Sequence, residues 1–301
     1  MRTLKEVLAD GTVLIADGSI GTQLQKAGLQ PGGCGDEWNV TNPEKVFRMH
    51  RDYVKAGAQV LTTNTFGANQ FVLSTYGLED RQAEIARRGA ELARAAIGDT
   101  GWVMGSVGPC GGFLEPLGSV SRGALEASLR VQIGALLEGG VDAIILETLT
   151  AAEELEVAVR VARSMDPPLL IASCTFDRLP KGGFRTMMGA TPQAMASIAV
   201  NGGADVIGSN CGTSMRPEDF AAIVAAYREV TKLPLLLEPN GGSPRLDGGA
   251  IVYPLTPGEL ANSLLPLAGT VQILGGCCGS SPEHIRVLAE GLKGIAAVGR
   301  S

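Results

Sequence analysis

The stretch Val271-Gln272-Ile273-Leu274-Gly275-Gly276-Cys277-Cys278-Gly279 leads from a short apolar strand into two adjacent cysteines between glycines. Adjacent cysteines do not easily form a disulfide with each other, but both thiolates can reach one metal ion where flanking glycines let the backbone turn sharply. Asn210-Cys211-Gly212 places a third cysteine in a similar position after an earlier apolar run. Three thiolates suit zinc and leave its fourth coordination position free for chemistry. We therefore interpret the rest of the chain as the scaffold that brings Cys211, Cys277 and Cys278 together.

The succession of an apolar strand, a polar loop and a helix recurs along the chain. Continuously apolar strands that alternate with helices are typical of a parallel sheet covered by helices, and eight such units in 301 residues predict a closed (β/α)8 barrel. We expect residues 1–301 to form a single domain. An open doubly wound sheet is less favoured, because no Gly-x-Gly-x-x-Gly turn follows the first strand. The predicted strands are residues 13–16, 60–63, 102–106, 143–146, 169–174, 205–209, 235–237 and 271–274.

Polar side chains come directly after most of these strands. In a barrel of this kind the carboxyl ends of all strands meet at one rim, which is the face that carries active sites. The residues that this rule gathers at one rim are Asp17, Asn64, Glu147, Asn210-Cys211, Glu238-Pro239-Asn240 and Cys277-Cys278.

A zinc ion held by three thiolates carries a formal charge of about −1, so it favours binding another sulfur over generating hydroxide. A substrate thiol at the fourth position would lose its proton and stay electron-rich, which indicates thiol alkylation rather than hydrolysis. The alternatives are a closed structural zinc site, or cysteines that are simply buried small side chains. Neither Cys110 nor Cys174 is flanked by glycine on both sides. We interpret His50 and His284 as ordinary core or surface residues.

Composition excludes several classes of partner. A net charge of −6 argues against nucleic acid or an anionic membrane, since both require a basic face. We see no apolar run long enough for a membrane span and no signal-peptide pattern. Six cysteines spread over a chain without secretory features indicate metal, catalytic or buried thiols in a reducing compartment. We expect a cytoplasmic protein that acts on a small molecule.

Asp17 and Glu147 have several open interpretations: a general acid–base pair, a binding site for a substrate ammonium, or solvated loop carboxylates. Backbone N–H groups of the loop Gly18-Ser19-Ile20-Gly21-Thr22 could bind a carboxylate. An ammonium at one end and a carboxylate at the other describe an amino acid, and an amino acid with a thiol is cysteine or homocysteine.

Six motifs together resemble the homocysteine S-methyltransferase family, over nearly the whole chain. The family includes the homocysteine domain of cobalamin-dependent methionine synthase, betaine–homocysteine methyltransferases and S-methylmethionine-dependent enzymes of methionine biosynthesis. The motifs are Asp17-Gly18-Ser19-Ile20-Gly21-Thr22, Thr63-Asn64-Thr65-Phe66-Gly67-Ala68-Asn69, Glu147-Thr148, Gly208-Ser209-Asn210-Cys211-Gly212, Pro239-Asn240-Gly241-Gly242 and Gly275-Gly276-Cys277-Cys278-Gly279.

The resemblance implies a (β/α)8 barrel in which Cys211, Cys277 and Cys278 bind zinc. It implies that Asp17 and Glu147 hold the amino group of homocysteine, while N–H groups after Asp17 hold its carboxylate. Asn240 resembles a position proposed to fill the zinc site when substrate is absent. The candidate catalytic residues are Cys211, Cys277, Cys278 and Glu147. The candidate substrate-binding residues are Asp17, Gly18, Ser19, Asn64, Thr65, Phe66, Glu147, Asn210 and Asn240.

The methyl donor stays open between S-methylmethionine, a methyl-corrinoid protein and betaine. Betaine is least favoured, because the family tyrosines expected beside Phe66 and Glu147 are Gly67 and Thr148 here. Without such rings the cation–π attraction that holds a quaternary ammonium is weakened. The alternative function is a homocysteine-activating module that works only with a separate corrinoid protein, and a homo-oligomer is also left open. A third interpretation is a binding protein with a structural zinc.

Overall fold

The computed structural model describes residues 1–247 and 250–298, and its centre is a barrel of eight parallel strands. The strand order in the sheet is β1-β12-β9-β8-β5-β4-β3-β2. A bridge between Ala16, directly after β1, and Val60 of β2 closes the ring. All eight predicted strands are present, so the predicted (β/α)8 barrel is confirmed. The strands are β1 Leu14–Ile15, β2 Val60–Thr62, β3 Trp102–Val107, β4 Ala143–Leu149, β5 Leu170–Cys174, β8 Val206–Cys211, β9 Leu235–Pro239 and β12 Ile273–Leu274.

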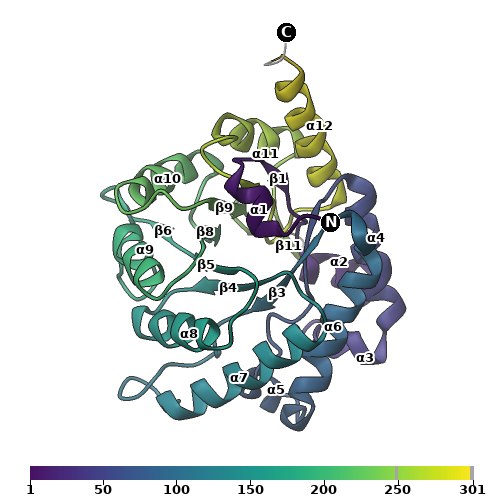
Figure 1. Ribbon diagram of the computed structural model, residues 1–301, viewed down its shortest axis with the longest axis vertical. Helices are drawn as coiled ribbons and strands as arrows, with labels where there is room; N and C mark the ends of the chain where they lie inside the picture. The colour runs from purple at the N-terminus through teal and green to yellow at the C-terminus, as the bar shows by residue number, and fades with distance from the viewer. Residues whose placement is uncertain (248–249, 299–301) are drawn as a thin grey trace.

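A ring of helices surrounds the strands (Figure 1). Their ends follow local chemistry: α4 begins with Pro43 at its first position and stops at Gly57, whose φ is 104°. Ser121 and Thr191 cap α7 and α9 by accepting a backbone N–H of the first turn. The outer helices are α4 Pro43–Ala56, α6 Gln82–Ile97, α7 Arg122–Glu138, α8 Ala152–Ser164, α9 Pro192–Asn201, α10 Phe220–Arg228, α11 Pro257–Leu264 and α12 Pro282–Val298.

Several short elements were not predicted from the sequence, and all lie in the loops that follow strands. Residues 20–26 form a helix instead of continuing the loop after the first strand, because Ser19 accepts the N–H of Thr22 and caps it. The glycine-rich segment 28–42 contains one helical turn. These elements are helices α2 Ile20–Lys26, α3 Trp38–Thr41 and α5 Gln70–Ser74, and the hairpins β6 Asp177–Arg178 with β7 Phe184–Arg185 and β10 Arg245–Asp247 with β11 Ala250–Val252.

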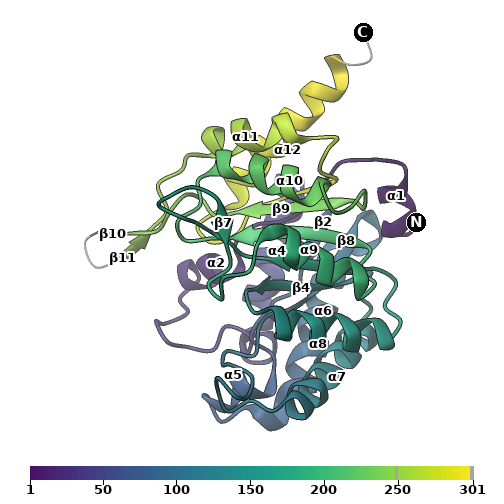
Figure 2. The same cartoon turned by 90° about the vertical axis from the view of Figure 1, so that its left-hand side faces the viewer.

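The barrel interior is apolar at its N-terminal end. Inward side chains such as Met104, Ile145 and Leu236 form a cluster that includes Leu4 and Leu8 of helix α1 (Leu4–Ala9). Helix α1 lies across this end of the barrel in Figure 1, and Figure 2 shows the β10–β11 hairpin projecting from the opposite end. The open mouth is therefore the end at which the strands finish, as the rule for this fold requires.

We found no helix in the described part of the chain with the length and apolar character needed to cross a membrane.

Candidate active site

The three predicted cysteine ligands meet at the mouth of the barrel. Cys211 is the last residue of β8, and Cys277 and Cys278 follow β12 after two glycines. The three sulfur atoms lie within 4.8 Å of one another, and Sγ of Cys277 is 4.0 Å from Sγ of Cys278. All three side chains are half-buried, whereas Cys34, Cys110 and Cys174 are buried elsewhere. The barrel thus brings together sulfurs that are far apart in the sequence.

Backbone geometry holds the cysteines in place. Cys211 itself has a φ of 60°, which a residue with a side chain seldom adopts and which indicates local backbone strain. The N–H of Cys277 donates to the carbonyl of Pro239 at 2.8 Å, which ties the cysteine pair to the end of β9. Gly279 has a φ of 80°, and a Cβ there would lie 2.0 Å from the Tyr253 ring. A glycine is therefore required directly after the pair.

The thiols influence one another strongly. Hydrogen bonds with the thiols of Cys211 and Cys277 lower the pKa of Cys278, whereas the thiols of Cys211 and Cys278, together with burial, raise the pKa of Cys277 well above its usual range. The three thiols therefore titrate as one coupled group. A cluster of thiols that stabilises a thiolate in this way is prepared for a soft cation.

The donor set fits a zinc ion. Three sulfurs placed around tetrahedral zinc at its usual bond length lie roughly 3.8 Å from each other, close to the separation in this cluster. Asn240 adds an independent observation: its Nδ2 donates to the carbonyl of Gly212, but its buried Oδ1 has no partner within the described residues. Such an orphaned oxygen beside the thiols is unusual unless something absent from the protein chain satisfies it.

Carboxyl groups line the barrel just below the mouth. Oδ2 of Asp17 accepts the backbone N–H of Thr62 at 2.9 Å, and Glu147 accepts the hydroxyl of Ser106. Burial raises the pKa of Asp17 to about 8 and that of Glu147 to about 7. Glu238 of β9 completes the group: burial, together with the nearby carboxyls of Glu147 and Asp17, raises its pKa well above its ordinary value.

The loop after Asp17 is the start of helix α2. The N–H of Ser19 is not free, because it donates to Oγ of Ser280 at 3.0 Å. The hydroxyl of Tyr53 donates to the carbonyl of Ser19, and a Cβ on Gly18 would lie 2.6 Å from Oγ of Ser280. The segment is therefore fixed against the residues that follow the cysteine pair, and carboxylate binding by the N–H groups after Asp17 stays a prediction.

The other predicted substrate residues already have protein partners. Nδ2 of Asn64 donates to the carbonyl of Gly35, and the fully buried Thr65 donates its hydroxyl to the carbonyl of Ser106. Phe66, in contrast, is exposed on the rim. Their roles in substrate binding stay predictions.

Asn210 joins the ends of two strands. Its Oδ1 accepts the N–H of Thr148 and the hydroxyl of Ser173, and its Nδ2 donates to Oγ1 of Thr148 at 2.7 Å. Thr148 has a φ of 60°, like Cys211, so the residues that follow Glu147 and Asn210 both have strained backbones. Asn210 therefore positions the backbone beside Glu147 and the first cysteine.

The sequence did not predict the residues that position the site residues through hydrogen bonds and packing. Ser106 and Thr62 position the two carboxylates, Ser280 positions Ser19, and Tyr253 covers Gly279. Glu238 was noted as a strand-end residue but not selected for the site. Its register provided a signal, because Glu238 lies two residues after the inward-facing Leu236.

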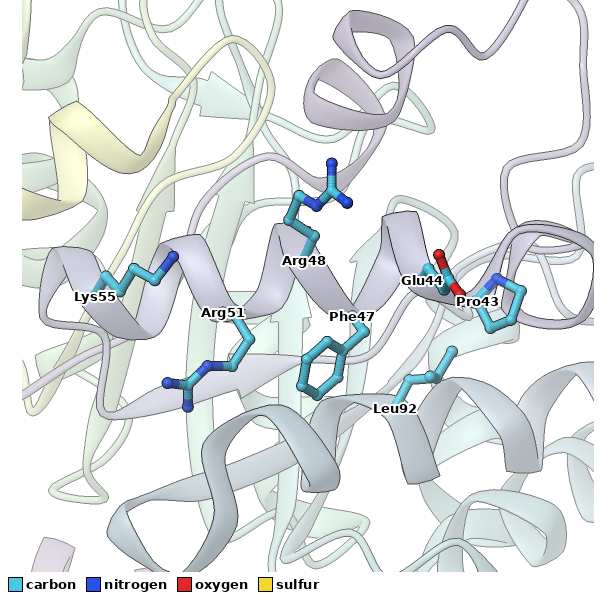
Figure 3. A pocket seen from close by; sticks show the side chains of 7 residues that line it. All are labelled: Pro43, Glu44, Phe47, Arg48, Arg51, Lys55 and Leu92. Atoms are coloured by element: carbon cyan, nitrogen blue, oxygen red, sulfur yellow. The ribbon is translucent and has the colours of Figure 1, made fainter.

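A surface hollow of about 590 Å³ lies well outside this region, on the helical layer. In Figure 3, Phe47 of α4 and Leu92 of α6 face one another, and Arg51 extends from the same side of α4 as Phe47. The lining contains no thiol and only one carboxylate, Glu44. The chemistry-bearing side chains therefore lie in the barrel mouth and not in this hollow.

Fold and site together define a (β/α)8 protein with a cluster of three thiols above a group of buried carboxyls. The family model described as homocysteine S-methyltransferase matches residues 14–292, so the chain belongs to the homocysteine S-methyltransferase family, which is a family of methyltransferases. The family resemblance seen in the sequence is thereby confirmed.

Individual relatives agree with this assignment. The chain is 32% identical over 298 residues to methionine synthase of Mycobacterium tuberculosis and 32% identical over 303 residues to that of Mycobacterium leprae. These matches cover 94% and 95% of the chain but 25% of each relative, so the chain spans about a quarter of their length. Among solved structures, the metallated form of the Escherichia coli homocysteine methyltransferase MmuM has a TM-score of 0.75 at 25% identity, covering 95% of this chain and 99% of that one.

Proposed function

We propose that this protein is a zinc-dependent methyltransferase that transfers a methyl group to the thiol of homocysteine and forms methionine. The single observation that carries the proposal is the cluster of Cys211, Cys277 and Cys278, whose sulfurs lie within 4.8 Å of one another at the mouth of the barrel. Zinc, when bound there, lowers the pKa of an incoming thiol so that it is a thiolate at neutral pH. The similarity to metallated MmuM supports a metal at this place.

The buried carboxyl groups below the mouth supply amino-acid recognition. Asp17 and Glu147 present carboxyl groups to the ammonium of homocysteine, while the first N–H groups of α2 bind its carboxylate. Ser106 and Thr62 fix the two acids in advance, so substrate binding does not have to order them. The amino acid is thereby oriented with its thiol toward the cysteines.

The methyl transfer balances without an oxidant or a base from the chain. The homocysteine sulfur releases its proton to solvent and attacks the methyl carbon, a new S–C bond forms, and the bond from that carbon to the donor breaks. With a sulfonium donor such as S-methylmethionine, the leaving group is a neutral thioether that takes the electron pair of the broken bond. The protein contributes the orientation of the thiol and the fixed carboxyl groups of Asp17 and Glu147.

Cobalt substitution tests this proposal. Purified protein loaded with Co²⁺ should show a thiolate charge-transfer band from the three cysteines that changes when homocysteine is added, because a fourth sulfur joins the metal. Turnover with zinc and S-methylmethionine should then give methionine. A structural site would bind the metal with no spectral response to homocysteine, and that result would refute the proposal.

A second candidate is a module that receives its methyl group only from a separate methyl-corrinoid protein. The observation that favours it is a set of large apolar side chains, 68% to 76% exposed, on loops around the mouth: Leu117, Met187, Leu246 and Ile251. Exposed apolar side chains gathered around one opening are typical of protein docking. Turnover only after addition of a methyl-corrinoid protein, and not with S-methylmethionine or betaine, would select this candidate.

We infer a cytoplasmic location, because all six cysteines are free thiols and a reducing compartment keeps thiols free.

A further inference from the structure

Glu238 is a buried acid that neither the metal centre nor the predicted ammonium site includes. It lies in β9, where Asn210 of β8 is its register partner, and its side chain is 6% exposed. Leu236, two residues earlier, belongs to the apolar cluster inside the barrel, so Glu238 points to the same side, one layer nearer the mouth. Cγ of Glu238 packs beside Gly275, where a Cβ would lie 3.2 Å away.

The three acids of this layer differ in how the protein holds them. Asp17 accepts the N–H of Thr62 and Glu147 accepts the hydroxyl of Ser106, but no described residue donates a hydrogen bond to the carboxyl of Glu238. A carboxyl group buried without a donor is costly, and native proteins rarely keep one unless a ligand uses it. Burial and the other two acids raise the pKa of Glu238, and its carboxyl oxygens are not among the fully buried unpaired atoms of the described residues, so a cation or a hydrogen-bond donor from outside the chain can reach them.

We propose that Glu238 is a third ammonium-binding residue and that it determines selectivity for thiols with a free α-amino group. This inference rests on the proposed function and extends it. An ammonium group has three N–H donors, and Asp17, Glu147 and Glu238 offer it three acceptors, from the loop after β1, from β4 and from β9. Two of the acceptors are held by the protein, and the third is satisfied by the substrate.

A structural role for Glu238 makes the opposite prediction. An acid that stabilises the fold would have protein donors, and its loss would lower the melting temperature. Because Glu238 has none among the described residues, replacing it with a neutral isostere should leave the free protein as stable as before or more stable. Substrate binding should weaken at the same time.

The test compares Glu238→Gln with the control Glu154→Gln in zinc-loaded protein. Glu154 is also 6% exposed, but it lies on α8 and accepts the N–H of Cys110, a bond that glutamine can keep. Calorimetry should measure the Kd of each protein for homocysteine and for 4-mercaptobutanoate, the same thiol acid without the amino group. Thermal unfolding and zinc content should be measured on the same samples.

We expect Glu238→Gln to weaken homocysteine binding about tenfold or more, since a charge-assisted hydrogen bond is lost. Binding of 4-mercaptobutanoate, zinc content and melting temperature should not fall, and Glu154→Gln should behave as wild type. Equal losses for both thiols, or a lower melting temperature with unchanged preference for the amino group, would overturn the inference while leaving the proposed function intact. Failure of the wild type to bind homocysteine would overturn both.

Discussion

The two ends of the barrel interior are built on opposite principles. At the closed end, Leu4 and Leu8 of α1 join an apolar cluster, and Thr3 and Glu6 form a reciprocal cap at the start of that helix. At the mouth, the inward positions carry thiols and carboxyls instead of apolar side chains, and the backbone of Cys211 is strained. The difference teaches that stability is concentrated at one end so that the other can keep reactive groups in unfavourable surroundings.

The largest expected effect comes from breaking the metal centre at the mouth. Cys211→Ala or Cys277→Ala should abolish zinc retention and methyl transfer, because two thiolates do not hold the ion in its three-sulfur environment. The barrel should remain folded, which circular dichroism would show, while metal analysis and turnover fall to background. Cys174→Ala, which removes a buried thiol of β5 away from the cluster, is the control and should keep zinc. Full activity in either ligand variant would remove the assignment.

A substitution at the closed end of the barrel should lower stability and leave zinc binding unchanged. Leu8 is buried in the apolar cluster, so Leu8→Ala should lower the free energy of unfolding by about 2–5 kcal/mol. Denaturant unfolding would measure this loss. Zinc content and the Kd for homocysteine should stay unchanged at temperatures where the variant is folded.

Lys5→Ala is the matched surface control on the same helix, since Lys5 makes only an exposed ion pair with Asp205. Its effect on stability should be below about 1 kcal/mol. If Leu8→Ala also removed zinc, the two ends of the barrel would be coupled and the comparison would not hold.

Glu147→Gln should change binding without changing the fold. The variant keeps an acceptor for the Ser106 hydroxyl but loses the charge that faces the substrate ammonium. We expect the Kd for homocysteine to rise about tenfold to a hundredfold, as is typical for a charged hydrogen bond. Calorimetry on zinc-loaded protein measures it, and unchanged affinity at equal zinc content would count against the role of Glu147.

The free energy of unfolding should also depend on pH, through the buried acids at the mouth. Burial raises the pKa of Asp17 from 3.8 to about 8 in the folded protein, so the folded state binds this proton more tightly than the unfolded state. Between these two pKa values the free energy of unfolding therefore falls as pH rises, by at most about 1.4 kcal/mol per pH unit for this one group. Urea unfolding of metal-free, ligand-free protein at several pH values measures the slope.

Asp17→Asn isolates this contribution, because asparagine can still accept the N–H of Thr62 but does not ionise. Its stability should depend less on pH than that of the wild type over the same interval. An identical slope in both proteins would show that the mouth acids do not carry the cost assigned to them.

Much of the fold followed from local patterns, and the exceptions have a common cause. The strands were visible because each is an apolar run in a fully covered parallel sheet. Helix α2 was missed because Gly18 and Gly21 look like loop residues, while the cap by Ser19 and the contact with Ser280 that fix it are tertiary features. The hairpins β6–β7 and β10–β11 were missed because their strands have only two or three residues, too few to show an alternating pattern.

The sequence by itself determined which groups are candidates for the chemistry, because glycine-flanked cysteines and strand-end acids are local features that a rule of the fold places on one rim. Only the tertiary structure decided how each group is held. Ser106 beside Glu147, Thr62 beside Asp17 and the absence of any described donor beside Glu238 depend on contacts between strands far apart in the chain. Hydrogen bonds of that kind have no signature along the sequence, since they arise when the closing barrel sets its inward side chains against one another.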